Sequence, residues 1–157
     1  MIWADLVVNK PVEIAEDIRI AQRHLLFGWW SLAIFVALGI TLETLHAFKI
    51  VSYMGVDAET RRLMWTLAHS HGTLLSIIQI VFGLTIPKLS EQTSNLRAWA
   101  SPCLLGASLL MPLGFFLGGI FYYSGDPGIG IFLVPPGGIL LLLGVILVAV
   151  NITRDFR

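Results

Sequence analysis

Four long apolar runs constrain the fold of this chain more than any other feature. They lie at about 25–46, 63–87, 98–122 and 129–150. A helix needs roughly 20 mainly apolar residues to cross the hydrocarbon core of a bilayer, and each run reaches that length. The runs therefore predict an all-α protein, a four-helix transmembrane bundle, built as one integral membrane domain over residues 1–157.

The charge content agrees with a membrane location. Only 13% of the residues are charged, against about a quarter in an ordinary soluble domain. Ten basic residues balance ten acidic ones, so the chain lacks the basic surface of a nucleic-acid-binding protein, and we expect no nucleic-acid partner. The expected partners are the lipid bilayer and either other membrane subunits or further copies of the chain. The single cysteine, Cys103, excludes an internal disulfide and a cysteine-rich metal site.

The segment at about 11–24 is predicted to be an amphipathic helix at the membrane interface. Pro11 suits the first turn of a helix, and the acidic residues Glu13 and Glu16 favour a helix N-terminus. Apolar residues then recur at helical spacing, at Ile14, Ile18, Ala21 and Leu25. This pattern is typical of a helix that lies on the membrane or leads into it.

The distribution of Lys and Arg predicts the orientation of the chain. With four crossings, both termini and the second loop share one side, which holds seven of the ten Lys and Arg residues, and the opposite side holds the other three. Cytoplasmic loops carry the excess of positive charge. We therefore expect both termini in the cytoplasm and a location in a bacterial inner (cytoplasmic) membrane. The two sets are Lys10, Arg19, Arg23, Lys88, Arg97, Arg154 and Arg157 against Lys49, Arg61 and Arg62.

The third and fourth runs have the character of a packing scaffold. Pro102 and Pro112 are expected to bend the third helix. Gly114 and Gly118 form a small-xxx-small face that permits close helix approach. The sequence 135–138, Pro-Pro-Gly-Gly, predicts that the last helix truly starts there, after a non-helical entry.

Four ionisable residues in the first two runs carry the functional signal. They are Glu43, His46, His69 and His71, and such residues are costly within a membrane and mark functional sites. Glu43 precedes Lys49 by six residues, and His69 follows Arg62 by seven. At about 1.5 Å per residue, both side chains are expected roughly 10 Å inside the outer boundary. A short loop would thus bring Glu43, His46 and His69 to one level.

Helical geometry separates the two histidines of the second run. Positions two apart differ by about 200° around a helix, so His69 and His71 face opposite ways. Glu43 and His46 are three apart and share a face with Gly39, which would allow close packing. Glu43, His46 and His69 are therefore the candidates for one shared site. His71 is expected to face lipid or to form a second contact.

Imidazoles with a carboxylate suggest metal chemistry. His69, His46 and Glu43 are candidate ligands of a transition metal such as copper or iron, and His69, His71 or His46 are candidate axial ligands of haem. A pair formed by Glu43 and His69 could alternatively carry protons without a cofactor. In a purely structural alternative, Glu43 pairs with Arg61 or Arg62, His46 lies among headgroups, and His69 hydrogen-bonds across helices.

The stretch Leu67-Ala68-His69-Ser70-His71-Gly72-Thr73-Leu74-Leu75 carries a family resemblance. It resembles the histidine-bearing helix of the catalytic subunits of haem–copper oxidases and nitric-oxide reductases. The resemblance implies that His69 or His71 is an axial haem ligand. It covers these nine residues, and because no histidine follows His71, it implies a single haem or metal site.

These patterns together predict a small membrane protein of a redox or respiratory system. It would bind haem or a transition metal between its first two helices near the outer face. Whether it is an enzyme stays open at this point. The alternatives are a non-catalytic accessory subunit of a larger membrane complex, and a transporter of protons or small solutes that uses Glu43 and His69.

Overall fold

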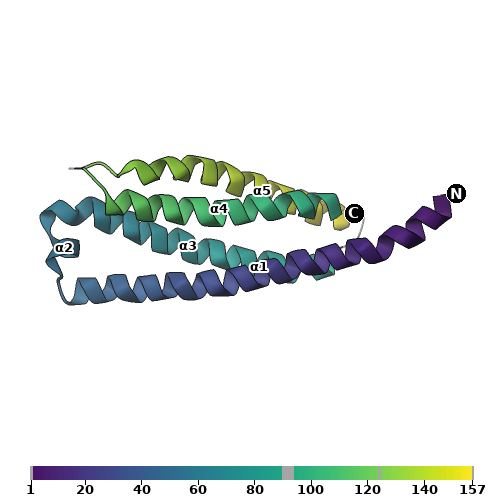
Figure 1. Ribbon diagram of the computed structural model, residues 1–157, viewed down its shortest axis with the longest axis horizontal. Helices are drawn as coiled ribbons and strands as arrows, with labels where there is room; N and C mark the ends of the chain where they lie inside the picture. Colours follow the sequence, from purple (N-terminus) through teal and green to yellow (C-terminus); the bar gives the residue numbers. More distant parts are fainter. Residues whose placement is uncertain (1, 90–93, 124, 157) are drawn as a thin grey trace.

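The chain is all-helical in the computed structural model (Figure 1). The structure describes residues 2–89, 94–123 and 125–156, and side chains within 15–89, 95–123 and 125–156. No strand is found in these ranges. The elements in chain order are α1 (Ile2–Ala47), α2 (Val51–Met54), the 3₁₀ helix η1 (Val56–Ala58), α3 (Glu59–Thr85), η2 (Ile86–Lys88), α4 (Ser94–Ile120), η4 (Ile129–Leu133) and α5 (Val134–Asp155).

Four of these helical segments are long and apolar enough to cross a membrane. This confirms the all-helical prediction and the number of candidate spans. The segments are Ala15–Ala47, Val56–Lys88, Asn95–Ile120 and Ile129–Asp155.

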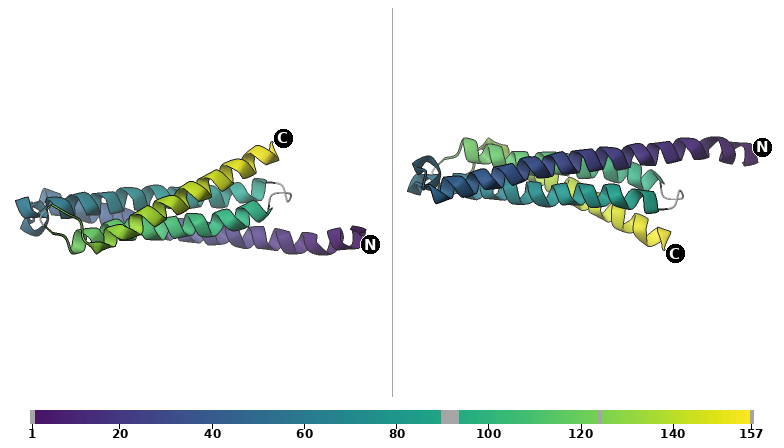
Figure 2. Two further views of the ribbon diagram at one scale, coloured as in Figure 1. Left: turned by 90° about the horizontal axis from the view of Figure 1, so that it is seen from above. Right: turned by 90° about the horizontal axis from the view of Figure 1, so that it is seen from below.

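The four long helices lie side by side and alternate in direction (Figures 1 and 2). Both chain termini lie at one end of the molecule, which we call the terminus end, and α2 and η1 lie at the other, the loop end. Helix α3 packs against both α1 and α4, and α5 packs against α4 and diverges towards its C-terminus. The most apolar windows of α1 and α5 are only 17% and 11% buried, against 44% and 50% for the other two. Helices α1 and α5 therefore present most of the outward apolar surface.

Close helix contact through glycine joins α1 to α3. An added Cβ at Gly28 would lie 2.7 Å from Cγ1 of Ile80 and 3.0 Å from the carbonyl oxygen of Ser76. On the facing helix, a Cβ added at Gly72 would lie 2.3 Å from the ring of Phe35. No side chain larger than hydrogen fits at either glycine without displacing its neighbours. The α1–α3 pair is thus a close-packed antiparallel unit.

The first helix differs from its expected division into an interfacial segment and a span. Helix α1 runs from Ile2 to Ala47 without a break, so no helix starts at Pro11 and no boundary lies near Leu25. The boundary near Leu25 is missing because positions 12–47 contain no proline that would interrupt the helical hydrogen bonds, and Pro11 itself lies inside α1. The last α-helix starts close to the expected place, since α5 begins at Val134 with proline in its first turn. The expected non-helical entry was wrong, because the 3₁₀ helix η4 leads directly into α5.

Two glycine-to-alanine substitutions test the close contact at Gly28. We expect Gly28→Ala to lower the free energy of unfolding by roughly 1–2 kcal/mol, because overpacking costs more than the gain in helix propensity. Gly138 is the matched control, since nothing lies within 4 Å of its ideal Cβ, and Gly138→Ala should raise the same quantity by up to about 1 kcal/mol. Unfolding in detergent, followed by circular dichroism, measures both. Shifts of the same sign would contradict the packing described here.

Candidate functional site

A cavity of about 370 Å³ lies between α1 and α3 at the loop end. Glu43, His46 and His69 all line it, so the structure brings these three sequence-predicted residues to one place. We call it the loop-end cavity. Its remaining lining consists of Val36, Gly39, Ile40, Leu42, Tyr53 and Thr66.

His69 is held in the loop-end cavity by a hydrogen bond across helices. Its Nδ1 atom lies 2.8 Å from the carbonyl oxygen of Phe35, on the facing helix. A carbonyl can only accept, so Nδ1 carries the proton, and Nε2 keeps its lone pair. The ring also lies against Gly39, where an added Cβ would be 2.4 Å from Cε1. Helix α1 therefore sets both the tautomer and the orientation of this imidazole.

Glu43 and His46 are exposed side chains on neighbouring turns of α1. Within the residues that the structure describes, the Glu43 carboxylate has no ion-pair partner. Arg61 donates to the carbonyl oxygens of Ser52 and Gly119. Arg62 donates to carbonyl oxygens of the α2 region. Arg61 and Arg62 are thus engaged by backbone carbonyl groups, and neither pairs with Glu43.

His71 lies apart from the other three residues. Its Nδ1 atom is 2.9 Å from the carbonyl oxygen of Leu67, one turn earlier on the same helix. Its ring packs against Phe115 of α4 with the centroids 4.8 Å apart. His69 therefore faces α1 and His71 faces α4, as expected for positions two apart on a helix.

A complete metal-binding cluster is not preformed. In the ranges whose side chains are described, no three His, Cys, Asp or Glu residues are grouped closely enough to hold a metal ion. The loop-end cavity instead offers one oriented imidazole and two exposed groups whose rotamers are free to change. Whether these residues bind a cofactor stays a prediction.

A second polar cluster, at the terminus end, was missed by the sequence reasoning. His24, Gln79 and Ser101 are fully buried, and Ser108 is nearly so. The His24 ring contacts Gln79 Oε1 through Nδ1 and lies 2.8 Å from Ser101 Oγ through Nε2. Gln79 Nε2 donates to Ser108 Oγ at 2.6 Å and to the carbonyl oxygen of Leu104 at 2.8 Å. The cluster therefore ties α1 to α3, α1 to α4 and α3 to α4.

The hydrogen bonds of this cluster are mutually consistent. Because the Gln79 amide nitrogen donates to α4, its oxygen accepts, and His24 must donate from Nδ1. Nε2 of His24 then accepts from the Ser101 hydroxyl, which in turn accepts from Arg23 Nη2 at 2.5 Å. A neutral imidazole satisfies every member, as a buried polar network requires.

An ion pair closes the terminus end beyond this cluster. The fully buried Arg97 of α4 donates to both carboxylate oxygens of Asp17 on α1, with Nε to Oδ1 at 3.0 Å and Nη2 to Oδ2 at 2.5 Å. Such two-point pairing fixes the relative position of two helices as well as adding energy.

The sequence contained one signal for the missed cluster. Gln79 is an amide in the middle of an apolar run, and such a group must find a partner in lipid. Its partner His24 was assigned to the interfacial segment, because the first apolar run starts at Leu25. His24 is buried because α1 packs against α3 at this level as well, next to Gln79 and Ser101.

Gln79→Leu tests the buried cluster. It leaves the Nδ1 donor of His24 without an acceptor, and we expect the free energy of unfolding to fall by roughly 1–2 kcal/mol. Gln22 is the matched control, an exposed glutamine on α1, and Gln22→Leu should change stability by less than about 0.5 kcal/mol. Unfolding in detergent measures both, and equal losses would show that the cluster adds no stability.

Comparison with known proteins places the chain in no family. No protein-family model matches it, and no similar curated protein or solved structure was found. The resemblance of residues 67–75 to a haem-ligating helix therefore stays a prediction, and function is inferred from the geometry of the chain itself.

Proposed function

We propose that the protein is a small membrane protein of a redox or respiratory system whose loop-end cavity binds a transition-metal centre. The centre is iron or copper, held either as an ion or as the iron of a haem, and His69 is its principal ligand. The observation that carries this proposal is the hydrogen bond from His69 Nδ1 to the carbonyl oxygen of Phe35.

Metal-ligating histidines characteristically donate their other ring N–H to a carbonyl or carboxylate oxygen. The bond to Phe35 supplies that arrangement, because it fixes the tautomer and leaves Nε2 as the ligand atom. The absence of a side chain at Gly39 lets the ring approach α1 closely.

The other donors in the loop-end cavity fit the same chemistry. Glu43 and His46 are three residues apart, so they project from one face of α1. Both line the cavity with His69, and imidazole with carboxylate suits iron and copper. The cavity volume, about 370 Å³, lies within the range of small-molecule sites, roughly 300–1,000 Å³. A bound centre would supply one-electron chemistry there, while the chain's residues hold and orient it.

His69→Leu tests this proposal, with His71→Leu as a matched control. We expect the His69 variant to lose bound iron or copper, because it removes the oriented Nε2 atom. The His71 variant should keep the metal, because His71 lies outside the cavity lining. Metal analysis of protein purified in detergent gives the stoichiometry, and a Soret band separates haem from an ion. Wild-type protein with neither metal nor Soret absorption, after supply of both during expression, would refute the proposal.

A second candidate function is proton or small-solute transport by Glu43 and His69. The observation that favours it is the Glu43 carboxylate, which lines the same cavity as His69 and has no ion-pair partner in the described residues. This transport function differs from metal binding because it requires a flux of protons or solutes in protein that holds no metal. pH-dependent flux in liposomes that Glu43→Gln abolishes, in metal-free protein, would select it.

The outward apolar surface of α1 and α5 also supports association with other membrane subunits or with further copies of the chain. Their most apolar windows are 17% and 11% buried. An accessory subunit would use that surface for helix partners as well as lipid. Native mass determination after mild extraction distinguishes a complex from a monomer.

We place both termini in the cytoplasm of a bacterium, on the basis of the seven-to-three distribution of Lys and Arg. Single cysteines in a Cys103→Ser background test this orientation. Asp126 and Phe156 are exposed at opposite ends of the molecule. In intact cells, a membrane-impermeant thiol reagent should label Asp126→Cys and leave Phe156→Cys unlabelled. The reverse pattern would invert the topology.

A further inference from the structure

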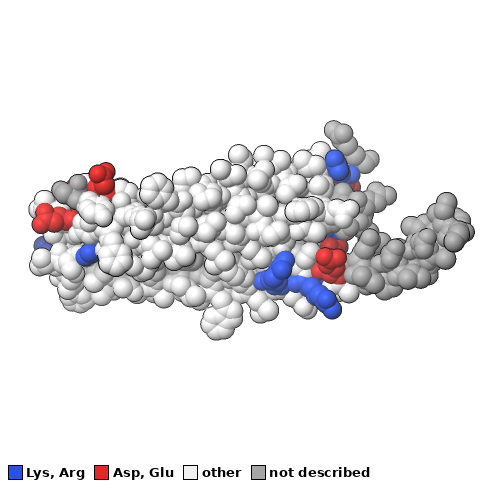
Figure 3. Space-filling view, turned by 45° about the horizontal axis from the view of Figure 1, so that its top comes forward, with Lys and Arg blue, Asp and Glu red and all other residues white. Residues whose placement is uncertain are grey.

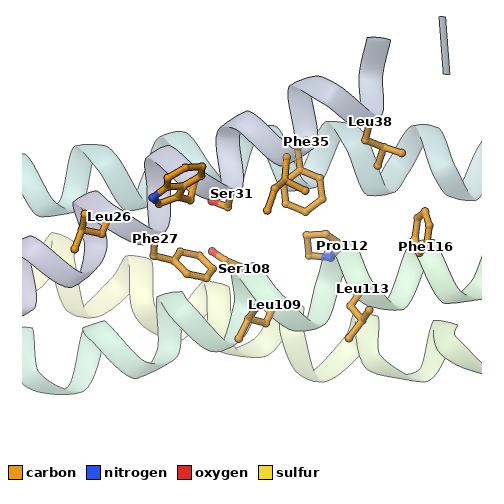
Figure 4. Close-up of a pocket in the computed structure, with 12 residues that line it drawn as sticks. Leu26, Phe27, Ser31, Phe35, Leu38, Ser108, Leu109, Pro112, Leu113 and Phe116 are labelled. Carbon is orange, nitrogen blue, oxygen red and sulfur yellow. The ribbon is translucent and has the colours of Figure 1, made fainter. Parts of the chain in front are cut away.

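A groove of about 650 Å³ runs between α1 and α4 (Figure 4). It exists because both helices pack on α3 but make little direct contact with each other. The walls are mainly apolar, and aromatic rings from both helices line it, among them Phe27 and Phe35 from α1 and Phe116 from α4. In Figure 4 the side chains of the two helices face each other across the gap. We call it the α1–α4 groove.

The α1–α4 groove has the length and direction of a lipid acyl chain. On α1 its lining extends from Leu26 to Leu38, and on α4 from Ser108 to Phe116. At 1.5 Å per residue these stretches are roughly 18 and 12 Å long, parallel to the helices. One leaflet of a bilayer contributes half of a hydrocarbon core of about 30 Å, or roughly 15 Å. The length of the groove is therefore comparable to the hydrocarbon depth of one leaflet.

The two hydroxyl groups of the groove are already paired to α3. Ser31 Oγ lies 2.7 Å from Ser76 Oγ. Ser108 Oγ accepts from Gln79 and donates to the carbonyl oxygen of Leu104. With these hydrogen bonds made, the remaining lining is hydrocarbon and aromatic carbon. An apolar chain suits this lining better than a ligand that needs hydrogen bonds.

Positive charge lies just beyond the end of the groove nearest the chain termini. Arg19 and Arg23 are exposed on α1, and helical periodicity puts both on the face that carries Phe27. The Arg23 guanidinium reaches across to Ser101 of α4. Figure 3 shows Lys and Arg at this end, with Asp and Glu beside them, next to a long uncharged surface.

Two carboxylates lie close to these arginines. Asp17 is held by Arg97. Glu16 is exposed one turn further out on α1, beyond the arginines as seen from the groove. Because Arg97 neutralises Asp17, Arg19 and Arg23 outnumber the remaining carboxylate, Glu16. The net charge of these residues is therefore positive.

We propose that the α1–α4 groove binds one acyl chain of an anionic phospholipid and that Arg19 and Arg23 hold the headgroup phosphate. Arginine binds phosphate through its planar fork of N–H donors. Trp30, 72% exposed, also lines the groove and adds aromatic surface to its α1 wall. This site is separate from the loop-end cavity and does not depend on the metal proposed there.

Native mass spectrometry of delipidated protein in mild detergent tests the site. The probes are phosphatidylglycerol and phosphatidylcholine with identical acyl chains. We expect one phosphatidylglycerol to be retained per chain and phosphatidylcholine to be lost at the same activation energy. Equal retention of the two lipids, or retention of neither, would overturn the proposal, as would preferential retention of a quinone offered in competition.

Matched variants locate the bound lipid. Leu109 and Leu142 are similarly exposed, 55% and 62%, but only Leu109 lines the groove. Leu109→Trp should block the acyl chain, and Leu142→Trp should leave binding unchanged. Arg19→Gln and Arg23→Gln should each weaken phosphatidylglycerol binding roughly fivefold, the effect of one charge near a lipid surface. Arg154→Gln, exposed on α5 at the same end, is the control.

Effects of the variants on folding are separated from their effects on lipid binding. Circular dichroism verifies the helix content of each protein before lipid is added. If Leu109→Trp loses helix content, the location is decided by comparing lipid binding of Arg19→Gln and Arg23→Gln with that of Arg154→Gln. Equal lipid retention by the two leucine variants, or equal effects of all three arginine variants, would exclude the α1–α4 groove as the site.

Discussion

The hydrogen bonds of the Gln79 amide hold α1, α3 and α4 in one register. A buried amide in an apolar environment must use both its oxygen and its nitrogen, and here the oxygen accepts from His24 of α1 while the nitrogen donates to α4. Sliding any of these helices by one turn would break the network. The register then places Gly28 and Gly72 at close contacts between α1 and α3.

Both proposed binding sites follow from how α1 lies on α3. Close packing along this pair brings the carbonyl of Phe35 within hydrogen-bond distance of His69, which orients the imidazole of the loop-end cavity. Helix α1 packs mainly on α3 and meets α4 mostly near the terminus end, through pairs such as His24–Ser101 and Asp17–Arg97. A gap therefore opens between α1 and α4 further along, and that gap is the α1–α4 groove. One packing arrangement thus produces a polar cavity at one end and an apolar groove between α1 and α4.

Much of the fold was predictable from residues alone. Each apolar run became a long helix, since runs of that length have few alternatives. The 135–138 sequence correctly marked the start of α5, which begins at Val134, because proline is favoured in a first helical turn. The boundary expected near Leu25 was wrong, as charged residues there did not end the helix and α1 is continuous. For the candidate site, depth counting brought Glu43, His46 and His69 to one cavity, whereas binding itself stays a prediction.

The sequence by itself determined the helices, their apolar character and the opposite directions of His69 and His71, because these depend on local spacing along one chain. Only the tertiary structure decided which polar groups become buried together. His24 and Gln79 are 55 residues apart, and no local pattern reports that α1 and α3 align these positions. It also decided that Arg61 and Arg62 bind backbone carbonyls and leave Glu43 facing the cavity. Pairing between distant polar groups depends on helix register, which is set by packing and hydrogen bonds across helices.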